Sequence, residues 1–301
     1  MHIHPTGVFA NHVKDYAHFS ATPLGAAMGA EITGIDIRKL TDASFAELAD
    51  ALYTHKMIFL RDQKVSHTDQ EEFTLRFGEF GKDAYTPGVE GHPEVQPVLK
   101  EADSKAHMIF GGAWHTDSPF LKRPPAITIL FGKDIPPYGG DTMWANSALA
   151  YAYLSEKMKE TINDLRVHMS ARTVLNEVKK GTQKYGEKSL GGTPLKFDPE
   201  PMIRGEFHPL VRTHPITGEK ALYVDDSYAV SIEGMTDNEA DMILQFLRRH
   251  MTQPAFTCRL RWEPSTLTLW DNRLCLHHAF NDHEGYRREM YRTTVLGEVP
   301  A

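Results

Sequence analysis

One short motif in this 301-residue chain combines two side chains that bind metal ions. Residues 114–118 read Trp-His-Thr-Asp-Ser, so His115 and Asp117 are two positions apart. If the motif lies at the end of a β-strand, both side chains point to the same face. One imidazole and one carboxylate, joined by a second histidine from elsewhere, would form the facial triad of non-haem iron(II) oxygenases. Three coordination positions would then stay open for a cosubstrate and oxygen.

A His-x-Asp triplet alone is weak support for a metal site, and the chain contains a second one. His67 and Asp69 follow Ser66, which predicts a capped helix with acidic residues in its first turn. On a helix, residues two apart diverge by roughly 200°, so this second pair cannot chelate one ion. For His115 and Asp117 the structural alternative is a polar turn at a strand end.

The candidate third ligands are His277 and His278, in the run Trp270-Asp-Asn-Arg-Leu-Cys-Leu-His-His-Ala-Phe280. Because the two histidines are adjacent, only one of them can face the metal if the run is a strand. Their spacing alone does not decide which.

Two arginines further on, Arg288 and Arg292, are four positions apart and would share a face of a strand. Arginine binds a carboxylate through two parallel hydrogen bonds, so such a pair suits a dicarboxylate. The alternative is a solvated charged face. Thr142 follows the turn sequence Gly139-Gly140-Asp141, and its hydroxyl is a candidate extra donor to the same carboxylate, although the segment could simply be a turn.

Composition limits the classes of function. Hydrophobic residues make up 41% of the chain and charged residues 24%, as in ordinary globular proteins. The net charge of −7 leaves no basic stripe for a nucleic acid, and no apolar run approaches the roughly 18 residues of a membrane span. Two cysteines are too few for a disulfide framework. We expect a cytoplasmic protein with a small-molecule substrate and no nucleic-acid or membrane partner; a homo-oligomer is compatible with all of this.

The elements that must position these residues are mostly short strands, which favours a jelly-roll barrel with flanking helices in one domain over residues 1–301. No Gly-rich phosphate loop follows a strand, which argues against a nucleotide-binding α/β fold. No apolar period is evident over residues 170–206, which we interpret as a mobile lid. Strands are predicted at 31–37, 57–60, 126–131, 257–262, 266–271 and 288–296. Helices are predicted after Thr41, from Ser66 to Gly78, over 149–165 and after Thr236.

Taken together, the motifs at 114–117, 139–142, 270–273 and Arg288…Arg292 resemble the taurine dioxygenase family of iron(II)/2-oxoglutarate-dependent dioxygenases. The resemblance runs from Pro23 to the C-terminus and implies a double-stranded β-helix. It implies Fe(II), 2-oxoglutarate and O2 as cofactor and cosubstrates, and it makes His115, Asp117 and His277 the iron ligands, which selects His277 over His278. It further places Arg292 and Thr142 on the distal carboxylate of 2-oxoglutarate, and Arg288 near the carboxylate beside the keto group.

The substrate end of the chain differs from taurine dioxygenase itself. Where that enzyme has a histidine and a tyrosine for the sulfonate, residues 80–85 keep Tyr85 but lack the histidine, so taurine is not the expected substrate. The segments 89–95, 208–211, 232–237 and 256–259 are more similar to the branch that acts on phenoxypropionate herbicides. The candidate substrate residues are Tyr85, Phe110, Phe120 and Tyr228, with Lys82 or Arg212 as the cation for an anionic substrate.

The expected reaction is hydroxylation of a C–H bond in a small organic anion: a phenoxyalkanoate, a sulfonate or an alkyl sulfate. Succinate and CO2 are the coproducts, and hydroxylation beside a heteroatom would collapse to a carbonyl compound and a released fragment. Asp117 fills the carboxylate position, which leaves a halide no vacant protein-ligand site and favours hydroxylation over halogenation. Two other functions fit the triad: a zinc hydrolase using metal-activated water, which leaves the two arginines unexplained, and a non-enzymatic barrel that binds a small acid.

Overall fold

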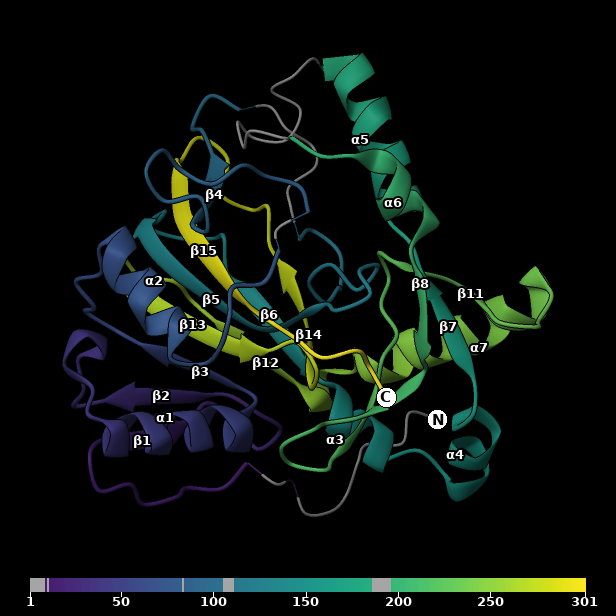
Figure 1. The fold of residues 1–301 in the computed structure, drawn as a ribbon, viewed down its shortest axis with the longest axis horizontal. Helices are drawn as coiled ribbons and strands as arrows, with labels where there is room; N and C mark the ends of the chain where they lie inside the picture. Colours follow the sequence, from purple (N-terminus) through teal and green to yellow (C-terminus); the bar gives the residue numbers. More distant parts are fainter. Residues whose placement is uncertain (1–8, 10, 83, 105–110, 186–195) are drawn as a thin grey trace.

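A computed structural model describes residues 9, 11–82, 84–104, 111–185 and 196–301. Most of its regular elements are strands, as the sequence predicts (Figure 1). The strands are β1 (Ser20–Pro23), β2 (Ala30–Thr33), β3 (Met57–Leu60), β4 (Gln96–Lys100), β5 (Pro125–Asp134), β6 (Thr142–Asn146), β7 (Arg166–Met169), β8 (Glu206–Pro209), β9 (Val211–Thr213), β10 (Lys220–Leu222), β11 (Ala229–Ile232), β12 (Thr257–Leu260), β13 (Thr266–Asp271), β14 (Cys275–Ala279) and β15 (Arg288–Leu296).

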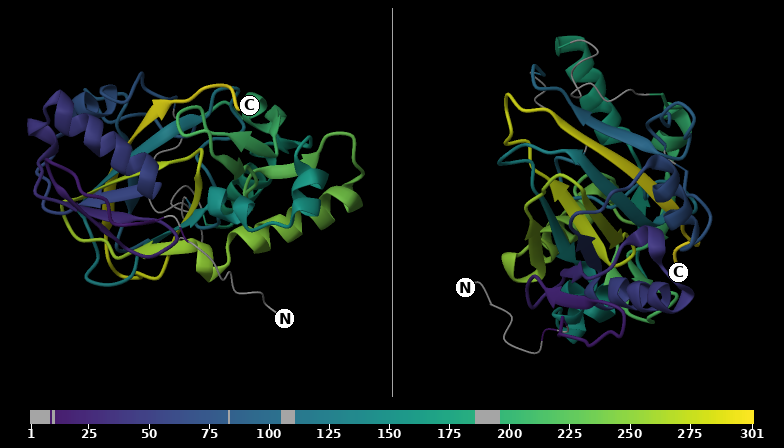
Figure 2. Two further views of the ribbon diagram at one scale, coloured as in Figure 1. Left: turned by 90° about the horizontal axis from the view of Figure 1, so that it is seen from below. Right: turned by 90° about the vertical axis from the view of Figure 1, so that its left-hand side faces the viewer.

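Helices flank the strands. They are α1 (Asp42–His55), α2 (His67–Leu75), α3 (Ser147–Ala152), α4 (Glu156–Ile162), α5 (Arg172–Tyr185), α6 (Pro199–Arg204) and α7 (Asp237–Met251), with 3-10 turns at Ile37–Lys39 and Pro254–Phe256. The two further views of Figure 2 place α1 and α7 on opposite sides of the molecule. None of the described helices is long and apolar enough to cross a membrane.

The largest sheet has seven strands in the order β1-β2-β3-β13-β5-β15-β4, and only the β2–β3 pair is parallel. Successive side chains of β5 point to opposite faces of this sheet, and the two faces contact different apolar clusters. Ile127, Ile129 and Phe131 join the apolar cluster that contains α1 residues, such as Leu48. Leu130 belongs instead to the second cluster, on the other face of the sheet. The inward face of β5 therefore carries Thr128 and Leu130 towards the interior of the protein.

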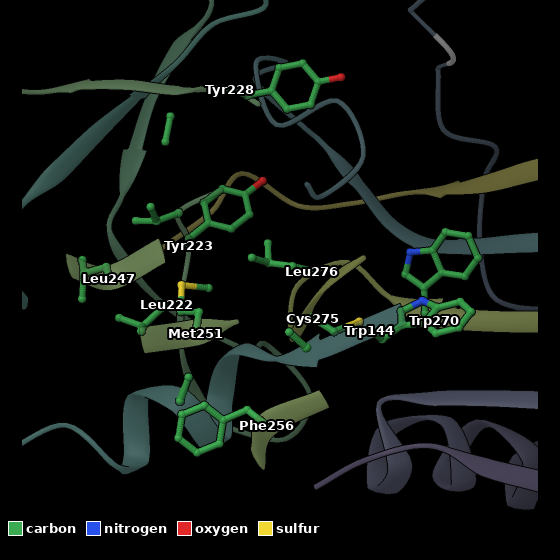
Figure 3. Packing of buried hydrophobic residues seen from close by; sticks show 14 of the residues in the cluster. Trp144, Leu222, Tyr223, Tyr228, Leu247, Met251, Phe256, Trp270, Cys275 and Leu276 are labelled. Carbon is green, nitrogen blue, oxygen red and sulfur yellow. The ribbon is translucent and has the colours of Figure 1, made fainter. Parts of the chain in front are cut away.

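A smaller sheet, β12-β6-β14, contributes to the same interior cluster as the inward face of the large sheet. Trp144 from β6 and Trp270 from β13 meet edge to face with their ring centroids 5.7 Å apart (Figure 3). Both side chains are almost fully buried. Aromatic pairs of this kind bury a large apolar area, so this contact holds the two sheets together at the level of β14.

The structure differs from several of the predicted elements and adds their arrangement in sheets. The strand expected over 31–37 ends at Thr33, because Gly34 takes a left-handed conformation with φ of +90°. The helix expected over 149–165 is two helices, because Ser155 interrupts it and caps α4 through the Met158 amide at 3.2 Å. The strands β12 and β13, adjacent in sequence, belong to different sheets.

The absence of regular structure expected over 170–206 is wrong for the described part of that segment, which contains α5 and α6. Leu175 and Val178 of α5 are buried, as is Met202 of α6. The amide of Ala171 also donates to the carbonyl of Met202 at 2.9 Å, which joins the two helices. An apolar stripe was therefore present, although short. Movement of this segment as a lid stays a prediction.

A buried ion-pair network stabilises the end of β13. The Asp271 carboxylate accepts hydrogen bonds from Arg273 Nη2 at 2.6 Å and Nε at 2.8 Å, and it lies 3.0 Å from His214 Nε2. Burial opposes the charge, but Arg273 and His214 hold the pKa of Asp271 well below its ordinary value. A carboxyl whose folded-state pKa is depressed stabilises the fold above its unfolded pKa of about 3.9, and this stabilisation is lost as the pH falls.

Replacing Asp271 with asparagine is expected to lower the free energy of unfolding by about 3–5 kcal/mol at pH 7, because the buried Arg273 would lose its two short hydrogen bonds and keep only Glu298, 3.5 Å away, as an acidic partner. The difference from the wild type should shrink below about pH 4, where the carboxyl of the unfolded chain is protonated. Urea unfolding at several pH values measures it. Asp134, whose side chain is half exposed, is the matched control, and D134N should change little because solvent screens exposed pairs. Equal losses in the two variants would contradict the prediction.

Candidate metal centre

The two candidate metal-binding segments are joined through their main chains. His115 and His277 form an isolated antiparallel bridge, in which the His115 amide donates to the His277 carbonyl at 3.0 Å and the His277 amide to the His115 carbonyl at 2.8 Å. Residues 114–118 thus form no strand of their own, contrary to the simplest reading of the motif. The bridge nevertheless fixes where both side chains lie.

Three donor atoms converge beside this bridge. One ligand atom from each of His115, Asp117 and His277 lies within 4.8 Å of the other two. Asp117 Oδ1 is 3.9 Å from His115 Nε2 and 3.7 Å from His277 Nε2, and all three side chains are buried. His278 is not part of this group and contacts Trp114 and Phe280 instead, with ring centroids 5.6 and 4.9 Å away. The structure therefore brings together the three predicted ligands, with His277 as the second histidine.

The protonation states of the three groups suit a divalent metal. Burial lowers the pKa of both histidines, that of His277 strongly, which favours neutral rings with a free lone pair. The Ala113 carbonyl, 2.9 Å from His115 Nδ1, can only accept, so Nδ1 carries the hydrogen and Nε2 keeps the lone pair. Burial opposes ionisation of Asp117, but the charge of Arg292 and the hydrogen bond from Thr128 favour the carboxylate and keep its pKa below the ordinary value. Two neutral imidazoles and one carboxylate are the donor set of non-haem iron sites.

One pocket is lined by all three of these residues and also by Thr142, Arg288 and Arg292. Arg292 lies at the metal-binding end, where its Nη1 is 3.3 Å from Asp117 Oδ1. It is four positions along β15 from Arg288, about 13 Å of strand. The pocket therefore has a cationic group at each end.

Arg288 and Thr142 mark the end away from the triad. The Trp262 indole donates to Thr142 Oγ1 at 2.9 Å, and the Arg288 guanidinium lies 5.8 Å from the centre of the same indole ring. Arg288 Nε is buried and makes no hydrogen bond within the described part of the chain. Burial lowers the pKa of Arg288 to about 10, so the group remains charged at neutral pH. A buried guanidinium in this state suits a carboxylate supplied by a ligand.

The predicted substrate residues divide into two groups. Tyr85 and Tyr228 line the pocket, and the Tyr85 hydroxyl donates to the Tyr228 hydroxyl at 3.0 Å. Phe120 lies behind them and packs edge to face on both, with centroids 5.8 and 5.3 Å away. Phe110 lies outside the described residues. The structure therefore gives the pocket an aromatic wall with a hydroxyl pair at its surface.

Neither of the two predicted substrate cations is among the residues that line this pocket. Lys82 is exposed and is not among the residues that line the pocket. Arg212 is buried outside the pocket, where it forms an ion pair with Glu298 and stacks 4.8 Å from the Tyr223 ring. Its charge is compensated within the fold, which a spacing argument could not detect.

Two residues next to Asp117 were not anticipated from the sequence. The Thr128 hydroxyl donates to Asp117 Oδ2 at 2.5 Å, and the side chain of Asn272 donates to Thr128 Oγ1 at 2.8 Å. A signal existed for Thr128, since it is a hydroxyl in the middle of the apolar run 126–131. Asn272 had none beyond its place in the motif at 270–273.

Comparisons with known proteins agree with this geometry. The family model described as taurine catabolism dioxygenase TauD, TfdA family, matches residues 20–294. The chain is 32% identical to the alpha-ketoglutarate-dependent sulfate ester dioxygenase of Pseudomonas putida, over 92% of this chain and 89% of that protein. It is 29% identical to the (S)-phenoxypropionate/alpha-ketoglutarate-dioxygenase of Sphingobium herbicidovorans, over 93% and 96%.

A solved structure of a taurine dioxygenase from Burkholderia xenovorans superposes with a TM-score of 0.77 at 35% identity, covering 94% of this chain and 93% of that one. The family match, the relatives and the solved structure all cover most of the chain. The chain therefore belongs to the TauD/TfdA family and is a 2-oxoglutarate-dependent dioxygenase, of a family whose enzymes use Fe(II), 2-oxoglutarate and O2.

Proposed function

We propose that His115, Asp117 and His277 hold Fe(II), and that the same pocket binds 2-oxoglutarate and a small organic anion whose C–H bond is hydroxylated. The observation that carries this proposal is the pocket itself. Three metal donors within 4.8 Å of one another lie at one end, and a buried, charged Arg288 lies towards the other. A dicarboxylate that chelates the metal with one end and reaches an arginine with the other suits such a pocket.

The roles of the two arginines follow from their positions. Arg292 is 3.3 Å from a proposed metal ligand, so we assign it to the metal end, near the carboxylate beside the keto group. Arg288 shares the far end with Thr142, and we assign these two to the distal carboxylate of 2-oxoglutarate. This assignment exchanges the arginine roles that the resemblance alone implies, because the order of the two residues along β15 places Arg288 further from the triad.

The bound iron would supply oxidative decarboxylation: one O2 and one 2-oxoglutarate give succinate and CO2, and one oxygen atom enters the substrate C–H bond. The residues of the chain position the reactants. Arg288 and Thr142 would orient 2-oxoglutarate, while Tyr85, Tyr228 and Phe120 would hold the substrate and exclude water. If the hydroxylated carbon carries a heteroatom, it collapses to a carbonyl compound and releases sulfate, sulfite, an alcohol or a phenol.

We infer a sulfate ester, a sulfonate or a phenoxyalkanoate as the substrate. The support comes from the relatives, one of which is named for sulfate esters and one for phenoxypropionate. Their identities of 32% and 29% are too similar to limit the substrate to the phenoxypropionate class.

We also propose that the described residues form one dioxygenase domain, in which the inward face of the large sheet and the β12-β6-β14 sheet make a double-stranded β-helix. Their shared apolar cluster and the family membership support this. The cytoplasmic location, the homo-oligomer and the lid stay predictions.

Succinate release in the presence of Fe(II), 2-oxoglutarate and air is expected with at least one compound from a panel of alkyl sulfates, alkyl sulfonates and phenoxyalkanoates. Chromatography of succinate and of the released fragment measures it. Reactions without oxygen or without 2-oxoglutarate are the controls, and both should be inactive. Product formation that survives without oxygen would favour the zinc hydrolase, which has no need of Arg288. No turnover, together with no binding of metal or 2-oxoglutarate, would contradict the proposed function.

A further inference from the structure

A chain of three buried hydrogen bonds ends on the candidate metal ligand Asp117. The Trp270 indole Nε1 donates to Asn272 Oδ1 at 2.9 Å, and Asn272 Nδ2 donates to Thr128 Oγ1 at 2.8 Å. Thr128 Oγ1 then donates to Asp117 Oδ2 at 2.5 Å. The four residues are 0–5% exposed, so water does not compete for these bonds.

The direction of every bond in this chain is fixed by chemistry. An indole nitrogen can only donate, so the atom of Asn272 that faces Trp270 must be the amide oxygen. The amide nitrogen of Asn272 therefore faces Thr128 and donates to it. Because Thr128 accepts this bond and has a single hydroxyl hydrogen, that hydrogen points to Asp117. Asp117 Oδ2 is thus held as an acceptor.

We propose that Thr128 and Asn272 are positioning residues that keep Asp117 a one-oxygen metal ligand. The inference rests on the proposed function, since it assigns the metal to the triad. Asp117 Oδ1 is the oxygen that lies 3.9 and 3.7 Å from the two histidine Nε2 atoms and 3.3 Å from Arg292 Nη1, whereas Oδ2 accepts the hydrogen bond from Thr128. A carboxylate that bound through both oxygens would occupy a further coordination position. The hydrogen-bond chain therefore preserves the three open positions that a facial triad offers.

The same residues also connect the metal-binding loop to the large sheet. Thr128 on β5 lies opposite Trp270 on β13 in the antiparallel register. The Thr116 hydroxyl, between the two ligands of the motif, donates to the main-chain carbonyl of Asn272 at 3.0 Å. Asp117 belongs to a loop, but the groups that orient it belong to the end of β13 and to the centre of β5. Support from rigid elements of this kind sets the precision of a site.

Thr128→Val removes the donor to Asp117 at nearly constant volume and is expected to raise the dissociation constant of Mn(II) by about 10- to 100-fold. Electron paramagnetic resonance of free Mn(II) during a titration measures it without turnover. The absorption spectrum of bound Co(II), which responds to coordination number, should also change. Thr128→Ser keeps the hydroxyl and should restore both properties to within about threefold of the wild type.

Thr268→Val is the matched control. Thr268 lies on β13, two residues from Trp270, and is fully buried. Its hydroxyl has no hydrogen-bond partner within the described residues, so the same substitution there should leave Mn(II) binding and the Co(II) spectrum unchanged.

Asn272→Asp tests the direction of the hydrogen bonds that run from Trp270 to Asp117. The introduced carboxylate would accept from Trp270 and also from Thr128, which turns the Thr128 hydrogen away from Asp117 and sets an oxygen lone pair against Oδ2. Mn(II) affinity should fall at least as far as in Thr128→Val, although Thr128 itself is unchanged.

The outcomes separate this inference from the proposed function. Wild-type protein that fails to bind Mn(II) would overturn the metal site and the inference with it. If the wild type binds, then wild-type affinity and an unchanged Co(II) spectrum in Thr128→Val would overturn the positioning role alone, as would equal losses in Thr268→Val. If Thr128→Val does not fold, the comparison of Thr128→Ser with Asn272→Asp decides, and equal Mn(II) affinities in these two variants would overturn the inference.

Discussion

Replacing His277 with alanine is expected to abolish metal binding in the pocket and to lower turnover by about 1,000-fold or more. The imidazole supplies one of three protein donors, and the remaining pair would hold the ion too weakly to supply its several kcal/mol of barrier lowering. Mn(II) titration and succinate production at saturating Fe(II) measure the two effects. His277 also lies in the main-chain bridge to His115, but that bridge uses only backbone atoms, so the variant should keep its fold.

His278 provides the matched control for this variant. It is the next residue on the same strand, and its ring packs against Trp114 and Phe280, away from the triad. His278→Ala should bind Mn(II) like the wild type and should retain turnover within a few-fold. A variant of His278 that lost the metal while His277→Ala kept it would reverse the ligand assignment.

The second large effect is expected from Arg288→Met, which should raise the KM for 2-oxoglutarate by about 100-fold or more. The substitution removes the guanidinium group, which would make two parallel hydrogen bonds to the distal carboxylate, each worth about 1.5–3 kcal/mol. The KM for the substrate should change much less, because Arg288 is assigned to 2-oxoglutarate and not to the substrate. Arg288→Lys keeps the charge but loses the two parallel N–H donors of arginine, so an intermediate KM for 2-oxoglutarate is expected. Initial rates at varied 2-oxoglutarate give both constants.

Arg287→Met is the control for this series, because Arg287 is the preceding residue and its partially exposed side chain pairs with Glu101 and Glu289. It should leave the KM for 2-oxoglutarate unchanged. Arg292→Met distinguishes the two assignments of the arginines. If it produced the large rise in this KM and Arg288→Met did not, the order proposed from the structure would be wrong.

Local signals in the sequence predicted the elements that have strong caps or apolar runs. Ser66 caps the start of α2 as predicted, and β3 and β13 have the bounds expected from their apolar residues. The break between α3 and α4 was not predicted, because a serine can lie within a helix as well as cap one. In the structure Ser155 caps α4 by accepting a hydrogen bond from the Met158 amide. The separation of β12 from β13 depends on their partners β6, β3 and β5, which no local pattern specifies.

In the candidate site, too, local motifs predicted some residues, and contacts between remote residues were not predicted. The motif at 115–117 and the family resemblance anticipated the three residues that converge, and the structure added the order of the two arginines along the pocket. The sequence did not reveal that Arg212 forms an ion pair with Glu298, because the two residues are far apart in the chain. The Thr128 and Asn272 contacts escaped prediction for a related reason, since they depend on the register of two strands that pair only in the folded protein.

The backbone bridge between His115 and His277 has a thermodynamic consequence. Bringing ligands from remote parts of a chain together costs conformational entropy. In a zinc finger this cost is offset only by metal binding, so the metal-free domain is unfolded. Here the cost is met when the polypeptide folds, through two amide–carbonyl pairs that involve no side chain. We therefore expect the metal-free protein to keep the two ligand segments in place. The bound cation should then exchange without unfolding of the surrounding sheets.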